Sequence, residues 1–405
     1  MLTLDRVYQA AHTLNGIVRK TDLILSQNIA PDCELYLKAE NLQVTGSFKI
    51  RGAYFKMASL SEDEKLSGVI ACSAGNHAQG VALSAQRLGI SATIFIPSLA
   101  PISKIEATKR MGAQIRLIDG LYDDAYDASC EFRQESGGVF IHPFDDPDVI
   151  AGQGTIGLEL LEQISDFDAV IVPIGGGGLI SGVAFTIKML NPTCKVYGVQ
   201  AVGAGSMYSS FKDNKRGSLA NVSTFADGIA VKSPGINTYE ICTQYVDEIV
   251  TVSDDEIATA ILTLMEQQKL VAEGAGATAV AAAMFNKLPL NGKKVCAIVS
   301  GGNIDVSILS RVINRGLRTT GRLSELAIEM LDKPGQLREV SAIIADLGAN
   351  VTKVIHNPGG ENTDINGCFL HISMETKNKS HFLDIKQAIQ KAGYAISEEG
   401  AFGNA

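Results

Sequence analysis

Short apolar runs alternate with longer amphipathic stretches from about Leu66 to Leu190, and this alternation restricts the fold more than any other feature of the sequence. The runs read GVIAC, SATIFIP, AQIRLI and AVIVPI, and a stretch with helical spacing follows each of them. Such alternation is typical of a doubly wound, mostly parallel sheet with helices on both faces. Two later runs, KVYGVQ and KVCAIVS, predict further buried strands. We therefore expect a large α/β body whose ligand lies at the edge where the loops after the strands gather.

A different order of strand-like and helical segments begins after a polar, glycine-containing stretch at residues 315–324, which we interpret as a linker. The segments that follow predict strands at 326–331, 350–356, 368–374 and 394–396, helices at 336–347 and 381–391, and a loop at 358–367. The order βαββαβ is that of a ferredoxin-like α+β unit. We expect a body over residues 1–320 and a small domain over 325–400.

Composition excludes several classes of partner. The 405 residues carry a formal net charge of -9 without a lysine or arginine run, which argues against nucleic acid and anionic membranes. Seven scattered cysteines without a CxxC pair predict small buried residues in a reducing compartment, with no metal site and no disulfide.

The N-terminal stretch lacks the features of a signal peptide, which favours a cytoplasmic location. The uncharged stretch Ala169–Ile187 contains Pro173 and five glycines, so it predicts a strand, a turn and a helix instead of a membrane span.

Lys49 is the first candidate for chemistry. It lies between Phe48 and Ile50 in a glycine-bounded turn, TGSFKIRG, that leads into a predicted helix. A lysine in apolar surroundings has a lowered pKa, as covalent catalysis by an amine requires. A surface lysine that happens to follow Phe48 is the simpler interpretation of this motif taken alone.

A second motif, Ser73-Ala74-Gly75-Asn76-His77, follows the run GVIAC and precedes a predicted helix. Backbone amides and short polar side chains at a helix N-terminus suit a small anion such as a carboxylate. Ser73 or Asn76 could instead cap the helix, and His77 could be a structural histidine.

Four consecutive glycines, Gly175–Gly178, precede Leu179 between a predicted strand and a predicted helix. Their amides can approach an anion closely, which predicts a phosphate cradle, although a lone glycine loop could be only a tight turn. The motif lacks the Gly-Lys-Ser/Thr of a Walker loop and the spacing of a dinucleotide fingerprint. A second glycine motif, at 274–279, lies between two predicted helical stretches, and we interpret it as close helix packing.

Ser300 ends the run KVCAIVS and is followed by Gly301, Gly302 and Asn303. A neutral hydroxyl at the end of a strand can hydrogen-bond a heterocyclic nitrogen without forcing its protonation. Taken alone, this motif is only another turn.

The ordered set of four motifs resembles the fold-type II (tryptophan synthase β-like) pyridoxal-phosphate enzymes over roughly the first 320 residues. ENLQVTGSFKIRGA, SAGNHAQG and PIGGGGL are similar to the threonine dehydratases, also called threonine ammonia-lyases. The resemblance implies two doubly wound sub-domains, the smaller of which, at about 50–150, is inserted in the larger. It also implies pyridoxal 5'-phosphate as cofactor and conversion of L-threonine to 2-oxobutanoate and ammonia, with L-serine as a second substrate giving pyruvate.

The resemblance also assigns roles. Lys49 would carry the cofactor and take the α-proton, with Phe48 packed against the ring. Cofactor contacts would further come from Asn76 at the phenolic oxygen, Gly175, Gly176, Gly177, Gly178 and Leu179 at the phosphate, and Ser300 at the pyridine nitrogen. The substrate carboxylate would meet Thr45, Ser73, Asn76 and His77. Glu273 would lie near the cofactor, in a role that the resemblance leaves open.

Besides a nicotinamide dehydrogenase, which the glycine spacing disfavours, three alternatives stay open. Serine racemases are similar, but they carry a serine where this chain has Ala74, whose methyl group cannot deliver a proton. Where they hold a divalent cation this chain has Gln200 and Ser206, so no magnesium site of that type is expected. A β-replacement enzyme of the cysteine-synthase kind and a catalytically idle amino-acid sensor are the other two.

The tail resembles an ACT domain, a ligand-sensing module, over about 326–398, on the strength of LDKPGQL at 331–337 and GANV at 348–351. The resemblance implies an effector, an amino acid or a nucleotide, between two such domains, with Gly335 and Asn350 as candidate contacts. It also implies a homodimer or homotetramer. An inert dimerisation module is the alternative.

Overall fold

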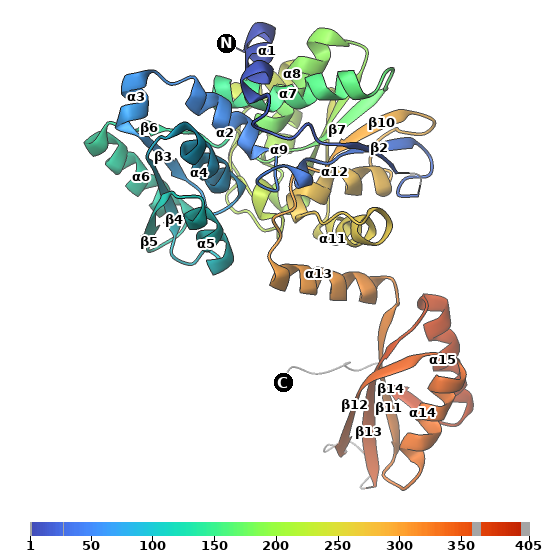
Figure 1. Cartoon of the computed structure of the whole chain (residues 1–405). Coiled ribbons are helices and arrows are strands. Elements are labelled where there is room, and N and C mark those ends of the chain that lie inside the picture. The colour runs from blue at the N-terminus through green and yellow to red at the C-terminus, as the bar shows by residue number, and fades with distance from the viewer. Residues whose placement is uncertain (1, 27, 359–365, 398–405) are drawn as a thin grey trace. The chain divides into compact units, whose positions relative to one another are not determined.

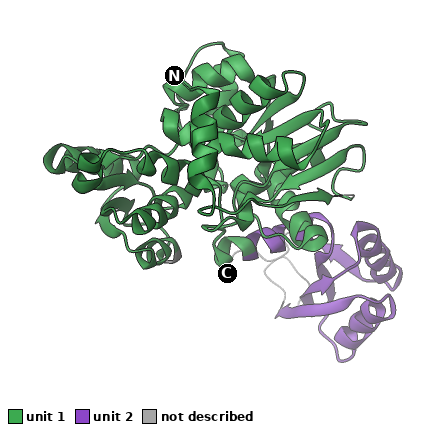
Figure 2. Cartoon of the chain, turned by 45° about the horizontal axis from the view of Figure 1, so that its top comes forward, with its two compact units in different colours: residues 1–309 green, residues 310–405 purple. Residues whose placement is uncertain are grey.

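The computed structural model describes residues 2–26, 28–358 and 366–397, and it divides the chain into two compact units, Met1–Leu309 and Ser310–Ala405 (Figure 2). The division falls inside a helix, α13 (Val306–Thr319), and the next strand starts at Leu323. The linker predicted at 315–324 is therefore wrong for most of its length, because its first half completes a helical turn and its end enters the sheet.

A six-stranded sheet forms the centre of the first unit (Figure 1). Its order is β1-β2-β10-β7-β8-β9, and all neighbours are parallel except β1 and β2. The strands are β1 (Leu23–Ser26), β2 (Glu34–Lys38), β7 (Ala169–Pro173), β8 (Lys195–Ala201), β9 (Glu248–Val252) and β10 (Lys294–Ile298). Since every residue of β7 is buried, the run AVIVPI has the continuous apolar character of a central parallel strand.

A second sheet, with four parallel strands in the order β5-β4-β3-β6, uses only residues between 69 and 140. Its strands are β3 (Val69–Cys72), β4 (Ala92–Pro97), β5 (Gln114–Ile118) and β6 (Val139–Phe140). The two sheets have separate apolar cores, around Ile94 and Val81 in one and around Val172 and Val183 in the other. The prediction of two doubly wound sub-domains is confirmed, and the four runs between Val69 and Pro173 are strands.

Helices connect and cover these strands, and one follows each of the four runs, as the helical spacing predicted. They are α1 (Leu4–Leu14), α2 (Lys49–Ala58), α3 (Glu62–Ser67), α4 (Asn76–Leu88), α5 (Ile102–Arg110), α6 (Tyr122–Ser136), α7 (Pro147–Gln163), α8 (Gly178–Leu190), α9 (Ser206–Lys212), α10 (Ile236–Tyr245), α11 (Asp254–Thr263) and α12 (Gly274–Met284). The uncharged stretch 169–187 is β7 followed by α8, as expected. None of the helices in the described part of the chain combines the length and apolarity needed to cross a bilayer.

The second unit has the predicted βαββαβ order, with an antiparallel sheet β12-β13-β11-β14. Its elements are β11 (Leu323–Leu331), α14 (Gln336–Asp346), β12 (Asn350–Pro358), β13 (Gly367–Glu375), α15 (Lys379–Lys391) and β14 (Ala395–Ser397). Val340, Ile385 and Ile389 pack onto the sheet side chains Ile328 and Leu370. The loop predicted between β12 and β13 lies largely outside the described residues.

Candidate active site

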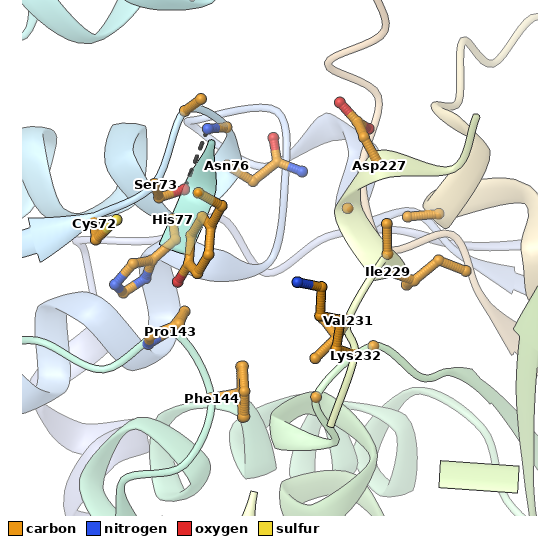
Figure 3. A pocket seen from close by; sticks show the side chains of 18 of the residues that line it. Cys72, Ser73, Asn76, His77, Pro143, Phe144, Asp227, Ile229, Val231 and Lys232 are labelled. Atoms are coloured by element: carbon orange, nitrogen blue, oxygen red, sulfur yellow. Dashed lines mark hydrogen bonds between the residues drawn. The ribbon is translucent and has the colours of Figure 1, made fainter. Parts of the chain in front are cut away.

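A cavity of about 1000 Å³ lies at the carboxyl edges of both sheets in the first unit. Its walls come from the segments after β3, β4, β5, β6, β7 and β10, together with the start of α2 and residues between 218 and 233. In Figure 3, Ser73, Asn76 and His77 face Asp227 and Ile229 across this space. The expectation that a ligand site forms after the parallel strands is therefore met in the geometry.

The cavity collects nearly all of the residues that the sequence singled out. Those that line it are Phe48, Lys49, Ser73, Asn76, His77, Gly175, Gly176, Gly177, Gly178, Leu179 and Ser300. Thr45 is different: it is not among the lining residues, its hydroxyl donates to the Ser47 carbonyl, and its side chain is buried. Thr45 thus lies apart from the residues that line the cavity, and its assignment to the substrate carboxylate stays a prediction.

Lys49 is the first residue of α2, and its amine reaches into the cavity instead of the solvent. Nζ donates to the carbonyl of Pro143 at 2.7 Å and lies 5.3 Å from the ring centre of Phe48. Burial lowers the pKa of the amine to about 8, against the opposing effect of the Glu273 carboxylate. The simpler interpretation of Lys49 as a surface lysine is wrong, and the lowered pKa gives the amine a larger neutral, nucleophilic fraction near pH 7 than an exposed lysine has.

This pKa predicts how the cofactor-free protein takes up pyridoxal phosphate. About one amine in ten is neutral at pH 7, so the uptake rate should rise about tenfold from pH 7 to about pH 9 and then level off. Stopped-flow absorbance of the added aldehyde measures this profile. In Glu273→Gln, which lacks the carboxylate that raises the pKa, the midpoint should move to lower pH. A rate that keeps climbing to the pKa of an exposed lysine would contradict the burial argument.

A buried ion network holds the first turns of α2, which carry Lys49. Arg51 is fully buried and contacts Glu40 at 2.7 Å and Glu159 at 2.6 Å. Lys38 joins the network through Glu159 at 2.6 Å. Burial alone would raise the pKa of Glu40, but the charge of Arg51 and its hydrogen bonds hold it below the ordinary value. The carboxylate of Glu40 is thus ionised, and the network joins α2 to α7 and to the segment after β2.

Asn76 is oriented by partners on both sides of its amide. Its Nδ2 donates to Glu273 Oε1 at 2.6 Å, and its Oδ1 accepts from Asn303 Nδ2 at 2.8 Å. One N–H of the amide therefore remains for a ligand. No side chain caps α4, whose first residue is Asn76, so the interpretation of Ser73 or Asn76 as its cap is wrong.

Glu273, whose role the sequence left open, is a fully buried neighbour of Asn76 and Lys49. Burial, and then the charge of Asp227, raises the pKa of Glu273 to about 7, while the hydrogen bond from Asn76 acts in the opposite direction. Its backbone N–H donates to the carbonyl of Gly301 at 3.0 Å. Glu273 therefore joins the segment after β10 to the start of α4 and titrates near neutral pH.

The motif at 274–279 also belongs to this region. It begins α12, and a Cβ at Gly276 would lie 2.1 Å from the carbonyl oxygen of Gly301. Besides this close approach to the backbone after β10, α12 packs against the neighbouring helix α11, which agrees with the predicted helix packing.

The loop before α4 supplies a small polar pocket. Ser73 Oγ accepts from the Gly75 amide at 3.2 Å (Figure 3). His77 is turned away from this role, since its Nε2 lies 2.7 Å from the carbonyl of Ile141 and must donate to it. Burial, followed by the nearby Lys49, lowers the pKa of His77 to about 3. The imidazole is neutral, so only the backbone amide of His77 is available to a carboxylate.

The loop Gly175–Gly178 is fixed by a hydrogen bond on the side away from the cavity, so that its amides face the cavity. Thr238 Oγ1 donates to the carbonyl of Gly176 at 2.6 Å, and in a trans peptide the next amide points the opposite way. Gly177 has φ of 101°, a conformation that favours glycine, and it caps α8 without a side chain. The first amides of α8 have no intrahelical acceptor, so they offer an anion site at the positive end of the helix.

Gly178 predicts a loss of cofactor affinity on substitution. A Cβ there would lie 2.8 Å from Cα and 2.9 Å from the carbonyl oxygen of Phe144, a backbone that cannot move cheaply. Overpacking of this kind costs about 1–3 kcal/mol, so Gly178→Ala should bind pyridoxal phosphate roughly 10- to 100-fold more weakly. Fluorescence titration measures the affinity. Gly205→Ala, whose nearest neighbours lie 3.8 Å away, is the matched control, and equal affinities of the two variants would overturn the prediction.

Ser300 lies where the segment after β10 pairs with the segment just before α2. Its carbonyl accepts from the Phe48 amide at 3.1 Å, and Ser47 forms an isolated bridge with Gly301. Ser300 is almost fully buried and lines the cavity close to Lys49. A neutral hydroxyl in this position suits a ring nitrogen that is not held protonated.

Sequence reasoning missed the segment after β6, residues 142–145. His142 and Phe144 line the cavity, His142 Nδ1 accepts two backbone amides, and Asp145 accepts the amides of Ile236 and Thr238 at the start of α10. The signal was available, because HPFDDP directly follows a strand of the parallel sheet.

Together these residues fit a phosphorylated heterocyclic aldehyde. A desolvated amine, a helix N-terminus with unbonded amides, a free amide N–H and a neutral hydroxyl all border one cavity. They correspond to the aldehyde carbon, the phosphate, the phenolic oxygen and the ring nitrogen of pyridoxal phosphate.

Comparisons with known proteins agree with this chemistry. The profile of the family described as "Pyridoxal-phosphate dependent enzyme" matches residues 14–301. An L-threonine ammonia-lyase of Thermotoga maritima is 49% identical over 398 residues, which cover 98% of this chain and 99% of that protein. Among solved structures, threonine deaminase isoform 2 of Solanum lycopersicum is 39% identical (TM-score 0.72; 77% of this chain, 94% of that chain), and maize serine racemase is 35% identical (TM-score 0.74; 78% and 98%).

Proposed function

The chain belongs to the pyridoxal-phosphate dependent enzymes of fold type II, and on that premise we propose that it is an L-threonine ammonia-lyase that also accepts L-serine. The observation that carries the proposal is the single cavity in which Lys49, Asn76, the glycine loop and Ser300 meet. The similarity to L-threonine ammonia-lyases over nearly the whole chain supports the choice of substrate.

When bound, pyridoxal phosphate supplies an electron sink that lets the α-proton of the amino acid leave and the β-hydroxyl depart. The residues of the chain do the rest. Lys49 would hold the cofactor, and its free amine would accept the α-proton at Nζ. The hydroxyl of Ser73 and the backbone amides of the loop before α4, including that of Asn76, bind the carboxylate and fix the α-carbon, while the side-chain amide of Asn76 serves the cofactor. The released enamine hydrolyses to 2-oxobutanoate and ammonia.

The two substrates differ by one methyl group. A pocket resolves a single methylene by only about 1–3 kcal/mol, so mixed activity on threonine and serine is expected.

Racemisation is the second candidate, because solved serine racemases are similar to this chain. The methyl group of Ala74 lines the cavity beside Ser73, and it cannot deliver a proton to the opposite face of the substrate. Gln200 and Ser206 use their side chains for backbone hydrogen bonds, to Ile174, Tyr208 and Val231. Elimination is therefore the favoured reaction.

The test incubates the pyridoxal-phosphate-loaded protein with L-threonine, L-serine and D-serine separately and follows 2-oxo acid over time, with chiral analysis of the remaining serine. Rapid formation of 2-oxobutanoate from L-threonine is the expected result. Bound cofactor without oxo acid from either L-amino acid would overturn the proposal, and sulfide with O-acetylserine would then test for β-replacement.

We further propose that residues 325–400 form an ACT domain that senses an amino acid or a nucleotide in a cytoplasmic homo-oligomer. Gly335 follows the end of β11. Asn350 lies at the other end of this strand, because Asn350 and Leu323, the first residue of β11, both stand opposite Glu375 of β13. At about 3.4 Å per residue, the two residues lie near opposite ends of β11, a strand of nine residues. A site that uses both therefore needs the turn of one copy and Asn350 of another.

A further inference from the structure

Three side chains with metal-binding atoms converge at one end of the sheet in the second unit. They are Asp332, His356 and Cys368, which we call the 332/356/368 cluster. One carboxylate oxygen, one imidazole nitrogen and the thiol sulfur all lie within 4.8 Å of one another. In the described part of the chain, this is the one group of three or more such residues that is compact enough to hold an ion.

The sheet register builds the cluster from residues far apart in sequence. Cys368 on β13 stands opposite Pro358 of β12, and His356 stands opposite Leu370. Opposite residues and those two positions along a strand share a face, so the imidazole and the thiol lie diagonally on the same face. The Asp332 amide donates to the Asn366 carbonyl at 2.7 Å, which continues the pairing of β11 with β13 and holds Asp332 beside them.

The exposure of the three side chains suits an ion that enters from solvent. Cys368 is 1% exposed, whereas the side chains of His356 and Asp332 are 47% and 61% exposed. The sulfur thus forms the floor of the site, and the nitrogen and oxygen form its rim.

The positions of the three side chains could also be explained without a metal ion. His356 Nε2 lies 3.6 Å from Asp332 Oδ1, as in a surface ion pair, and Cys368 packs with the core around Leu370. Neither explanation requires the third group, yet all three ligand atoms share one small volume. The three atom types together match borderline-soft transition metals better than calcium or magnesium, which take oxygen ligands.

We propose that the 332/356/368 cluster binds one Zn²⁺-class transition-metal ion per chain, with three protein ligands and water in the open position. Bond lengths of about 2.0–2.3 Å require ligand atoms to lie roughly 3.2–3.8 Å apart, so side-chain rotations that close the cluster by about 1 Å suffice. Binding releases the thiol proton to solvent as the sulfur–metal bond forms. The proposal revises the expectation of no metal site, which rested on the absence of short ligand spacings.

The test uses the full-length protein after dialysis against a chelator, with Co²⁺ and Zn²⁺ as probes. We expect one equivalent of Co²⁺ to give a thiolate-to-cobalt charge-transfer band together with the visible bands of a four-coordinate ion, and Zn²⁺ to displace it. Cys368→Ser should abolish the charge-transfer band. His356→Asn and Asp332→Asn should each weaken Zn²⁺ binding by more than about tenfold, since even indirect partners of a metal are worth that much.

Cys33→Ser and His12→Asn are matched controls, because they remove a half-buried thiol and an exposed imidazole elsewhere in the chain. Both should bind like the unaltered protein. Because His356 and Asp332 are exposed, their variants keep the test decisive even if Cys368→Ser fails to fold. Absence of the charge-transfer band, or equal Zn²⁺ affinity in all variants, would overturn the proposal.

Discussion

Replacing Lys49 with alanine is expected to lower the turnover of L-threonine by at least about a thousandfold. The change removes the amine that holds the cofactor and also the group that accepts the α-proton, while Phe48 and the glycine loop stay in place. Oxo-acid formation at saturating L-threonine and pyridoxal phosphate measures the loss, and the visible spectrum reports whether the cofactor is still attached.

Lys65→Ala is the control for this variant, because Lys65 lies on the surface helix α3, where its amine pairs with the exposed Glu62. Its activity should match that of the unaltered protein. If the Lys49→Ala protein kept more than a tenth of the activity, another residue would have to act as the base.

Replacing Arg51 with methionine should lower the free energy of unfolding by about 3–5 kcal/mol. Methionine fills much of the space of the arginine side chain but leaves the fully buried carboxylate of Glu40 without its cation. Glu159 also loses its contact with Arg51, although Lys38 remains 2.6 Å from it. Urea denaturation followed by near-ultraviolet circular dichroism measures the difference.

The pH dependence of this difference identifies its cause. In the unaltered protein the pKa of Glu40 is lowered, so its contribution to stability is present above the unfolded pKa and lost on acidification. Without Arg51, burial raises that pKa, and the variant is penalised at neutral pH but not in acid. The gap in stability should therefore narrow as pH falls toward the ordinary carboxyl value of 4.5.

Lys20→Met is the matched control, because Lys20 and Glu162 form an ion pair with side chains 55% and 64% exposed. Its effect should stay below about 1 kcal/mol. A similar loss in both variants, or a gap that does not change with pH, would contradict the buried-network explanation.

The sequence was sufficient for those site residues whose roles depend on their own segment. Lys49, Gly175–Gly178 and Ser300 each stand at the end of a strand or the start of a helix, and the parallel sheets bring such positions to one edge. Local pattern therefore predicted the strands that bring these positions together, whereas the roles of the residues came from the resemblance of the four ordered motifs to a known family.

Roles that depend on side-chain direction could not be predicted in this way. His77 lies in the expected loop, but its imidazole turns to Ile141, and Thr45 turns to Ser47. The coupling of Asn76 to Glu273 joins segments 197 residues apart and has no local signature. The 332/356/368 cluster depends likewise on strand register, which no ligand spacing in the sequence reveals.

The pairing of β2 with β10 has a consequence for synthesis on the ribosome. Leu35 of β2 stands opposite Val295 of β10. The early strand β2 therefore cannot pair until β10, near the end of the first unit, has been synthesised. At about 5–20 residues per second, the wait is roughly 10–50 s, during which the four strands between Val69 and Phe140 are already complete. Lys49 is thus translated early but meets Ser300 late. A nascent chain should gain the ability to bind its cofactor only in the last steps of elongation through this unit.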